Sequence, residues 1–265
     1  MEIALTIAGS DSGGGAGIQA DLKTFHRFGV YGVSAVTAIT AQNTLGVAKW
    51  VAVTPDMVRA QIDAIATDLR PRATKTGMLA NRRIVAVVAC SISEHRLSPY
   101  VLDPVMVATS GDILLDDAAL AGIRRDLVPL ADIVTPNLDE ASILLGSPVR
   151  DVGAMELAAR HLFSLGARGA LVKGGHLAGD RVIDVFFDGT QVDLFERPKL
   201  DTRHTHGTGC TLSAAIAANL ALGHDLRTAV TSSLDFVHAA IATAPGLGSG
   251  HGPLNHFATI AGGNG

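Results

Sequence analysis

A glycine-rich stretch near the C-terminal end, residues 205–214, has the composition of an anion-binding turn. Gly207 and Gly209 flank Thr208, and the Ala- and Leu-rich run that follows favours a helix beginning near Gly209. The first turn of a helix leaves backbone N–H groups unpaired and carries partial positive charge. The turn therefore predicts a cradle for a phosphate or for the charge that develops during phosphoryl transfer. A glycine-containing loop before a buried helix explains the pattern equally well.

Cys210 falls in the first turn of that predicted helix, where a thiol pKa can drop below its ordinary value of ~8.5. A thiolate beside an anion-binding turn is a candidate general base. An inert, buried thiol is the alternative. Cys90 is the only other cysteine, so nothing indicates a disulfide framework.

Further polar residues follow short apolar runs that have the pattern of buried strands. Asp103 and Lys173 end two such runs, and Asn137 and Glu140 follow a third with helical spacing. Ligands of parallel α/β sheets gather at the carboxyl ends of strands. We therefore interpret Asp103, Asn137 and Glu140 as oxygen groups around Mg²⁺-phosphate, and Lys173 as a phosphate partner. A capping box explains Asn137 and Glu140 as well, and a solvated edge explains Lys173.

The chain opens with an apolar run, a glycine-rich loop at 9–17 and a helical pattern at 18–28. Residues 15–20 fit the G-x-G-x-x-A variant of the dinucleotide fingerprint, but Gln42 and Asn43 follow the next strand where an acidic residue is required. This argues against a dinucleotide site. Asp21 faces the glycine loop and could accept a hydrogen bond from a substrate, or merely compensate the helix terminus.

Gln42 offers a hydrogen-bond donor and an acceptor together, which suits the edge of a nitrogen heterocycle. An ordinary polar loop is the alternative. His204 and His206 are two residues apart and lack the spacing of a zinc site.

Alternating strand and helix patterns continue along the chain and predict one α/β domain over residues 1–265. Helices are expected at 57–69, 81–95, 116–127, 153–165 and 225–243. Residues 47–53 predict a small β flap, and 181–195 a hairpin with an Asp-Gly turn. The Gly- and His-rich tail, 246–265, is expected to be partly loose.

The overall composition narrows the function classes. The formal net charge is −4 with 48% hydrophobic and 17% charged residues, and no basic cluster suits nucleic acid. No apolar run approaches the ~20 residues of a membrane helix, and the first ten residues lack a leader pattern. A cytoplasmic protein without membrane or nucleic-acid partners is the expectation.

Seven motifs stand in an order that covers almost the whole chain: residues 8–21, 40–44, 75–78, 103–106, 135–140, 172–176 and 206–210. Together they resemble the hydroxymethylpyrimidine/phosphomethylpyrimidine kinases of thiamin biosynthesis, which belong to the ribokinase superfamily. The resemblance implies a three-layer α/β/α sandwich with a mostly parallel central sheet and a small β flap. It also implies ATP, Mg²⁺ and a homodimer.

The resemblance implies two successive phosphorylations, first of 4-amino-5-hydroxymethyl-2-methylpyrimidine and then of its monophosphate, which yield the diphosphate. On this side of the site, Gln42 would bind the pyrimidine's amine and ring nitrogen. Asp21 and Gly9 would help to hold the substrate, and Met78 would line the apolar face of the ring.

On the phosphate side, the resemblance implies that Asp103 and Glu140 position Mg²⁺. Lys173 and Asn137 would contact the phosphates of ATP. The turn at 207–210 would be the anion hole. Many members of the superfamily have Asp where Cys210 stands, and a Cys here matches the pyrimidine kinases.

Two other functions remain open at this point. A pyridoxal/pyridoxine kinase on the same scaffold is the first, and Gln42 argues against it because an amide matches an aminopyrimidine edge better than a phenolic pyridine. A non-catalytic pyrimidine sensor is the second. The presence of Asp103, Glu140, Lys173 and Cys210 argues against a protein that has lost turnover.

Overall fold

The computed structural model describes residues 1–106, 117–175, 177 and 179–259. Within these ranges, one nine-stranded sheet runs through the molecule in the order β3-β2-β1-β4-β5-β6-β7-β8-β9. Its strands are β1 Ile3–Asp11, β2 Tyr31–Asn43, β3 Gly46–Ala52, β4 Ala73–Thr76, β5 Tyr100–Leu102, β6 Ile133–Val134, β7 Ala170–Val172, β8 Arg181–Phe187 and β9 Val192–Pro198.

The six central strands, β2-β1-β4-β5-β6-β7, pair in parallel. Each edge is antiparallel: β3 pairs with β2, and the β8–β9 hairpin extends the sheet beyond β7. The parallel centre places the carboxyl ends of six strands along one side of the sheet. Polar residues that follow those strands are thereby brought together.

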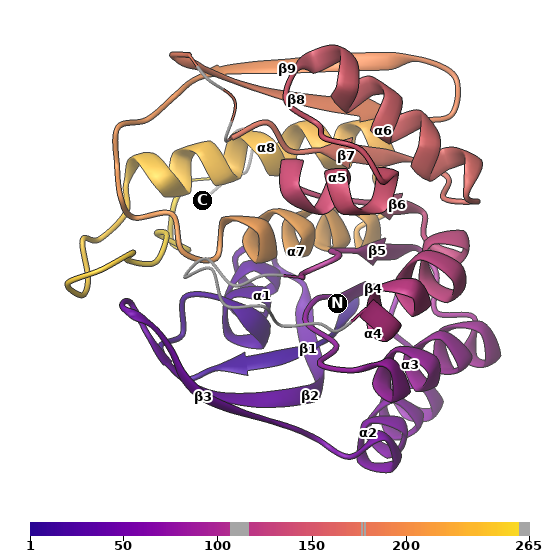
Figure 1. The fold of residues 1–265 in the computed structure, drawn as a ribbon. Helices are drawn as coiled ribbons and strands as arrows, with labels where there is room; N and C mark the ends of the chain where they lie inside the picture. The colour runs from indigo at the N-terminus through magenta and orange to yellow at the C-terminus, as the bar shows by residue number, and fades with distance from the viewer. Residues whose placement is uncertain (107–116, 176, 178, 260–265) are drawn as a thin grey trace.

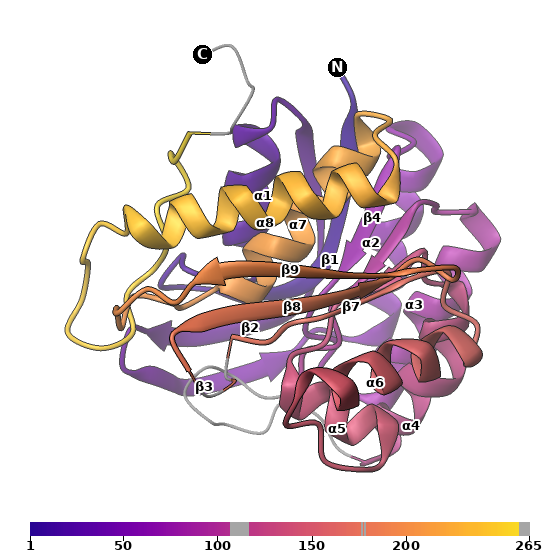
Figure 2. The same cartoon turned by 90° about the horizontal axis from the view of Figure 1, so that it is seen from above.

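Helices cover both faces of the sheet, as Figures 1 and 2 show. They are α1 Gly17–Arg27, α2 Pro55–Asp68, α3 Arg82–His95, α4 Asp117–Gly122, α5 Leu138–Leu145, α6 Val152–Ser164, α7 Thr208–Ala221 and α8 Leu226–Ala242. Buried residues of α1, α7 and α8 share one apolar cluster, and those of α2 to α6 share another. The expected three-layer α/β/α sandwich with a mostly parallel sheet is confirmed.

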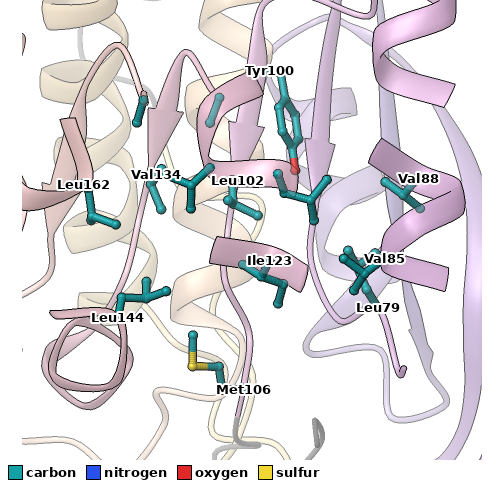
Figure 3. Close-up of a cluster of buried hydrophobic side chains, with 14 of the residues drawn as sticks. Leu79, Val85, Val88, Tyr100, Leu102, Met106, Ile123, Val134, Leu144 and Leu162 are labelled. Atoms are coloured by element: carbon teal, nitrogen blue, oxygen red, sulfur yellow. The ribbon is translucent and has the colours of Figure 1, made fainter. Parts of the chain in front are cut away.

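The two apolar clusters arise because successive side chains of a strand point to opposite faces. In β5, Tyr100 and Leu102 enter one cluster and Val101 the other. Figure 3 shows part of the larger cluster, where Leu102 and Val134 from neighbouring strands lie near helical residues. Each fully buried Val, Leu or Ile stabilises the fold by about 1.5–3 kcal/mol.

Several predicted elements have different bounds in the structure. The second strand extends to Asn43, so Gln42 lies within β2 and not beyond its end. The helix predicted at 116–127 is α4 followed by a π-helical turn, Ile123–Leu127. The hairpin turn spans four residues, since Phe187 pairs with Val192. The carboxylate of Asp188 holds this loop by accepting from the N–H groups of Thr190 and Gln191.

The prediction of a loose tail is wrong for its described part. Leu254, His256 and Ala258 are buried, and Pro253 forms a backbone bridge with His206. Leu254 and Ala258 belong to the apolar cluster that α1, α7 and α8 share. The glycine content of the tail gives no indication of this packing. Among the described residues, no helix combines the length and apolar character required to cross a membrane.

Candidate active site

A cavity of about 790 Å³ lies at the carboxyl ends of the parallel strands, within the size range of small-molecule sites. Its walls come from β1, β2, the loops after β4 to β7, the segment 197–210 and helix α8. Of the predicted site residues, all but Asp21 line it. The fold thus gathers predicted residues that are up to 201 positions apart in the sequence, from Gly9 to Cys210.

The glycine turn before a helix is present at the predicted place, and α7 begins at Thr208 with Gly207 as its N-cap. Gly207 has φ of 83°, and a Cβ there would lie 1.8 Å from the carbonyl oxygen of Gly15. Only glycine therefore fits where the two glycine-rich loops touch. A Cβ on Gly209 would come within 3.2 Å of Lys173 Nζ, so the turn lies directly beside a cation.

Cys210 lies in the first turn of α7, as predicted, but its thiol is not acidified. Burial raises the pKa of Cys210 to about 11, although the Lys75 ammonium opposes the shift. Removal of the thiolate from water outweighs the field of the helix terminus. The expectation of a lowered pKa is therefore wrong for the ligand-free site.

A charged cluster stands next to the anion-binding turn. Lys173 Nζ lies 3.3 Å from Asp103 Oδ1 and 3.9 Å from Glu140 Oε2. Burial lowers the pKa of Lys173, but the two carboxylates more than reverse this and leave it raised. Ser213 donates to Asp103 Oδ2 at 3.1 Å and orients that carboxylate.

Glu140 is held in an electrostatically costly position. Burial raises the pKa of Glu140 to about 7, with Asp103 adding to the shift and Lys173 opposing it. The alternative interpretation as a capping box is also confirmed: Glu140 accepts from the N–H of Asn137, and its own N–H donates to Asn137 Oδ1 at 2.9 Å. Both residues line the cavity, so the cap also fixes their positions there.

The carboxylates of Asp103 and Glu140 fit Mg²⁺ by the chemistry of their donors. Mg²⁺ binds hard oxygen ligands, usually one or two carboxylates together with water and substrate phosphates. Among the described residues, no cluster of three or more His, Cys, Asp and Glu side chains forms a closed metal cage. The pair therefore suits a metal that arrives with a phosphate ligand.

The opposite end of the cavity is neutral and partly apolar. Gln42 reaches it from β2, just after a bulge between Ala41 and Gln42. Met78 lines the same end, and a Cβ on Gly9 would come within 3.2 Å of the Met78 sulfur. Gly9 thus lets the backbone of β1 approach Met78 closely. An amide and an apolar side chain in the same cavity suit a small heterocycle.

Asp21 lies elsewhere, and its predicted contact with substrate needs correction. The residue is fully buried and does not line the cavity. Both of its carboxylate oxygens lie 2.9 Å from Lys75 Nζ, and Thr6 donates to it at 2.6 Å. Burial lowers the pKa of Lys75, but Asp21 and the Cys210 and Asp103 groups raise it above its usual value. Asp21 is a structural partner of a buried lysine.

Sequence reasoning missed several cavity residues. Asp11 ends β1 and orders the glycine loop by accepting from the N–H groups of Gly13, Gly15 and Ala16. Its position at a strand end before glycines was an available signal. The spacing of His206 and His204 suggests no role beyond a zinc site, which it argues against. In the structure, His206 Nε2 lies 2.9 Å from Asp11 Oδ2.

The wall of the cavity nearest β8, β9 and α8 was also missed. Val182, Leu200, Val237 and Ile241 give it an apolar surface, with Arg197 beside them. These residues come from separate elements and share no sequence motif. An apolar wall with a cation suits a planar base that carries phosphates.

Comparisons with known proteins agree with this geometry. A family model described as phosphomethylpyrimidine kinase matches residues 11–255. A hydroxymethylpyrimidine/phosphomethylpyrimidine kinase of Bacillus subtilis (strain 168) is 47% identical over 256 residues, covering 96% of this chain and 94% of the relative.

Solved structures of relatives share the fold. A phosphomethylpyrimidine kinase from Clostridium difficile 630 is 39% identical with a TM-score of 0.82, covering 91% of this chain and 100% of the other. A Bacillus subtilis pyridoxal kinase, solved as an ADP complex, is 40% identical with a TM-score of 0.90, covering 97% and 98%.

Proposed function

This chain belongs to the phosphomethylpyrimidine kinase family, and we propose that it transfers phosphoryl groups from ATP to 4-amino-5-hydroxymethyl-2-methylpyrimidine and then to the monophosphate. The diphosphate that results serves thiamin biosynthesis. One observation carries the proposal: a lysine–carboxylate cluster and a glycine turn at a helix start line the same cavity as the Gln42 amide and the Met78 side chain.

The phosphate end supplies charge where phosphoryl transfer needs it. Lys173 and Asn137 would contact the phosphates of ATP, and Asp103 and Glu140 would hold Mg²⁺, since all four residues line the cavity. When bound, Mg²⁺ neutralises charge on the phosphate oxygens. The N–H groups at the start of α7 face the transferred group, because residues 207–210 form the turn that opens into the cavity.

The neutral end holds the acceptor. Gln42 pairs with the amine and ring nitrogen of the pyrimidine, and Met78 and Gly9 pack against its ring. This orientation directs the hydroxymethyl group toward Cys210, which also lines the cavity. Positioning of this kind supplies much of the acceleration in phosphoryl transfer.

Cys210 acts as the base that accepts the hydroxyl proton in the first step. Its raised pKa of about 11 makes the thiolate scarce but strongly basic. The second step needs no such base because a phosphate nucleophile is already ionised. Loss of the thiol therefore affects the first step more than the second.

A two-step assay with variants tests these roles. Product masses are followed with the pyrimidine or its monophosphate as acceptor, for wild type, Cys210→Ala and Cys210→Ser. We expect Cys210→Ala to slow the first step by about 10²-fold or more and the second by under about tenfold. Equal slowing of both steps would leave Cys210 only as part of the turn.

A pyridoxal kinase is the second candidate because a structure of that activity shares the fold at 40% identity. The amide of Gln42 favours the aminopyrimidine. Gln42→Ala is expected to raise the KM for the pyrimidine about 10–100-fold while the KM for ATP stays within about twofold. A wild-type preference for pyridoxal would instead establish the second candidate.

We also propose a cytoplasmic homodimer. The edge strand β3 and its neighbours expose large apolar side chains, Leu45, Trp50 and Val51. An exposed apolar patch on an edge strand is a common protein interface. Light scattering should give twice the mass of the 27.3 kDa chain, and Val51→Lys should shift it toward the monomer.

A further inference from the structure

Three polar side chains, Asp11, His206 and Gln42, line the cavity and lie close to one another. His206 Nε2 lies 2.9 Å from Asp11 Oδ2 and 3.4 Å from the Gln42 amide nitrogen. The side chains of His206 and Asp11 are only 9% and 3% exposed. Their contacts are therefore largely shielded from water.

The position of the hydrogen on His206 follows from the state of Asp11. Burial raises the pKa of Asp11, but hydrogen bonds from His206, Ala16 and Gly13 outweigh this and leave it below its usual value. An ionised carboxylate only accepts hydrogen bonds. Nε2 of His206 therefore carries a hydrogen, which it donates toward Asp11.

The imidazole of His206 is fixed in place from two further sides. Its backbone N–H donates to Gly252 in the C-terminal segment at 3.1 Å. A Cβ on Gly15 would lie 2.6 Å from His206 Cδ2, so the glycine loop packs directly on the ring. The Nε2–H group of His206 is thus a rigid donor beside the Gln42 amide.

A rigid donor selects one orientation of the Gln42 amide. Turning an amide over exchanges its oxygen and nitrogen with little change in shape. With the nitrogen toward His206, two N–H donors face each other. With the oxygen there, it shares the single Nε2 hydrogen of His206 with Asp11 in a three-centre hydrogen bond. The nitrogen then faces the Thr40 hydroxyl, which can accept because its own hydrogen goes to Ser10 O at 2.9 Å.

We propose that His206, held by Asp11, is a positioning residue that fixes the orientation of the Gln42 amide and thereby selects an aminopyrimidine over a hydroxypyridine. The inference rests on the proposed role of Gln42. In the selected orientation Gln42 retains one N–H and one oxygen lone pair for the ligand. This pair matches an amine next to a ring nitrogen, which a hydroxypyridine such as pyridoxal lacks.

The test compares kcat/KM for the hydroxymethylpyrimidine and for pyridoxal, together with the KM for ATP. His206→Phe removes the donor, His206→Gln keeps an N–H at the end of the side chain, and His256→Phe is the matched control. His256 is as buried as His206, at 7% exposure, but binds Thr211 and does not line the cavity.

For His206→Phe, we expect the pyrimidine-to-pyridoxal ratio to fall about ten- to hundredfold, with the KM for ATP within about twofold. His206→Gln should restore most of the ratio, and His256→Phe should leave it unchanged even if the protein melts earlier. A wild-type ratio in His206→Phe overturns the inference. Equal loss in His256→Phe also overturns it, because the effect would then be purely structural.

Two variants keep the result decisive. If His206→Phe does not fold, Asp11→Asn is expected to lower the same ratio, because a neutral amide no longer fixes the hydrogen on Nε2. Gln42→Ala separates the two proposals. An unchanged ratio in Gln42→Ala refutes its proposed role, whereas a fall there without a fall in His206→Phe refutes only the positioning role.

Discussion

Two lysine–carboxylate clusters lie near the anion-binding turn, and they differ in how well their charges are paired. Lys75 and Asp21 are both fully buried and joined by two contacts of 2.9 Å. Lys173 lies 3.3 Å from Asp103 and 3.9 Å from Glu140, and its side chain is 14% exposed to the cavity. The first cluster is closed and the second is open.

The difference indicates which cluster works on a ligand. A closed pair satisfies its own charges and has little left to offer a phosphate. The open cluster leaves a cation only partly paired and a carboxylate, Glu140, whose pKa burial raises to about 7. Perturbed groups that face a cavity are typical of functional sites.

The largest expected effect comes from opening the closed pair. Lys75→Met leaves the Asp21 carboxylate buried without its partner, and we expect a loss of about 3–5 kcal/mol in the free energy of unfolding, measured by urea denaturation. The double variant Lys75→Met/Asp21→Leu should recover at least half of it. A single variant as stable as wild type would show that the pair is not the sealed structural element described here.

Lys173→Met, the matched change in the open cluster, should act on turnover. We expect kcat to fall about 10²–10³-fold because a donor facing the transferred phosphate is lost. The free energy of unfolding should fall by less than half of the loss in Lys75→Met. Wild-type kcat combined with a large loss of stability would reverse the assignment of the two clusters.

Glu140 gives the open cluster a pH signature. Because its pKa is about 7 when folded and ~4.5 when unfolded, the folded state binds more protons between these values. Stability should therefore decrease by up to about 2 kcal/mol as the pH rises from 4.5 to 7, when measured by urea denaturation without metal.

Glu140→Gln is the control for this slope, since Gln preserves the capping box with Asn137. The free energy of unfolding of this variant should not decrease between pH 4.5 and 7. If the free energy of unfolding of Glu140→Gln depended on pH as that of wild type does, ionisation of Glu140 would not destabilise the folded protein. The charges of the open cluster would then be as well paired as those of the closed one.

The smallest effect is expected from an exposed ion pair. Arg181 and Glu196 face each other across β8 and β9 at 2.9 Å, with side chains about half exposed. Arg181→Met should change the free energy of unfolding by less than about 1 kcal/mol in thermal or urea melts. If Arg181→Met lowered the free energy of unfolding as much as Lys75→Met does, ion pairing without burial would determine the size of the effect.

The two clusters also explain what the sequence could and could not predict. Asp103 and Lys173 directly follow buried strands, so the rule for parallel sheets correctly brought them to one edge. Asp21 follows the first glycine loop and was expected to contact substrate. Its partner is instead set by the pairing of β1 with β4, which brings Thr6 opposite Lys75. No local pattern in the sequence contains that register.

Long-range contacts account for the other differences. The packing of Leu254 and Ala258 with α7 and α8 gives order to a glycine-rich tail, and the Asp11–His206 contact joins residues 195 positions apart. The pKa of Cys210 depends on burial, which outweighs the local effect of the helix terminus. Local patterns predicted the elements, whereas the balance of charge and burial required the assembled site.

Product analysis by mass tests most directly whether the open cluster supports phosphoryl transfer from ATP to the pyrimidine. Wild type and Lys173→Met would each be incubated with ATP, Mg²⁺ and either the hydroxymethylpyrimidine, its monophosphate or pyridoxal. We predict monophosphate and diphosphate products with wild type, weak or no pyridoxal product, and loss of both pyrimidine products in Lys173→Met. Binding of the pyrimidine without any consumption of ATP would contradict the account and indicate a sensor.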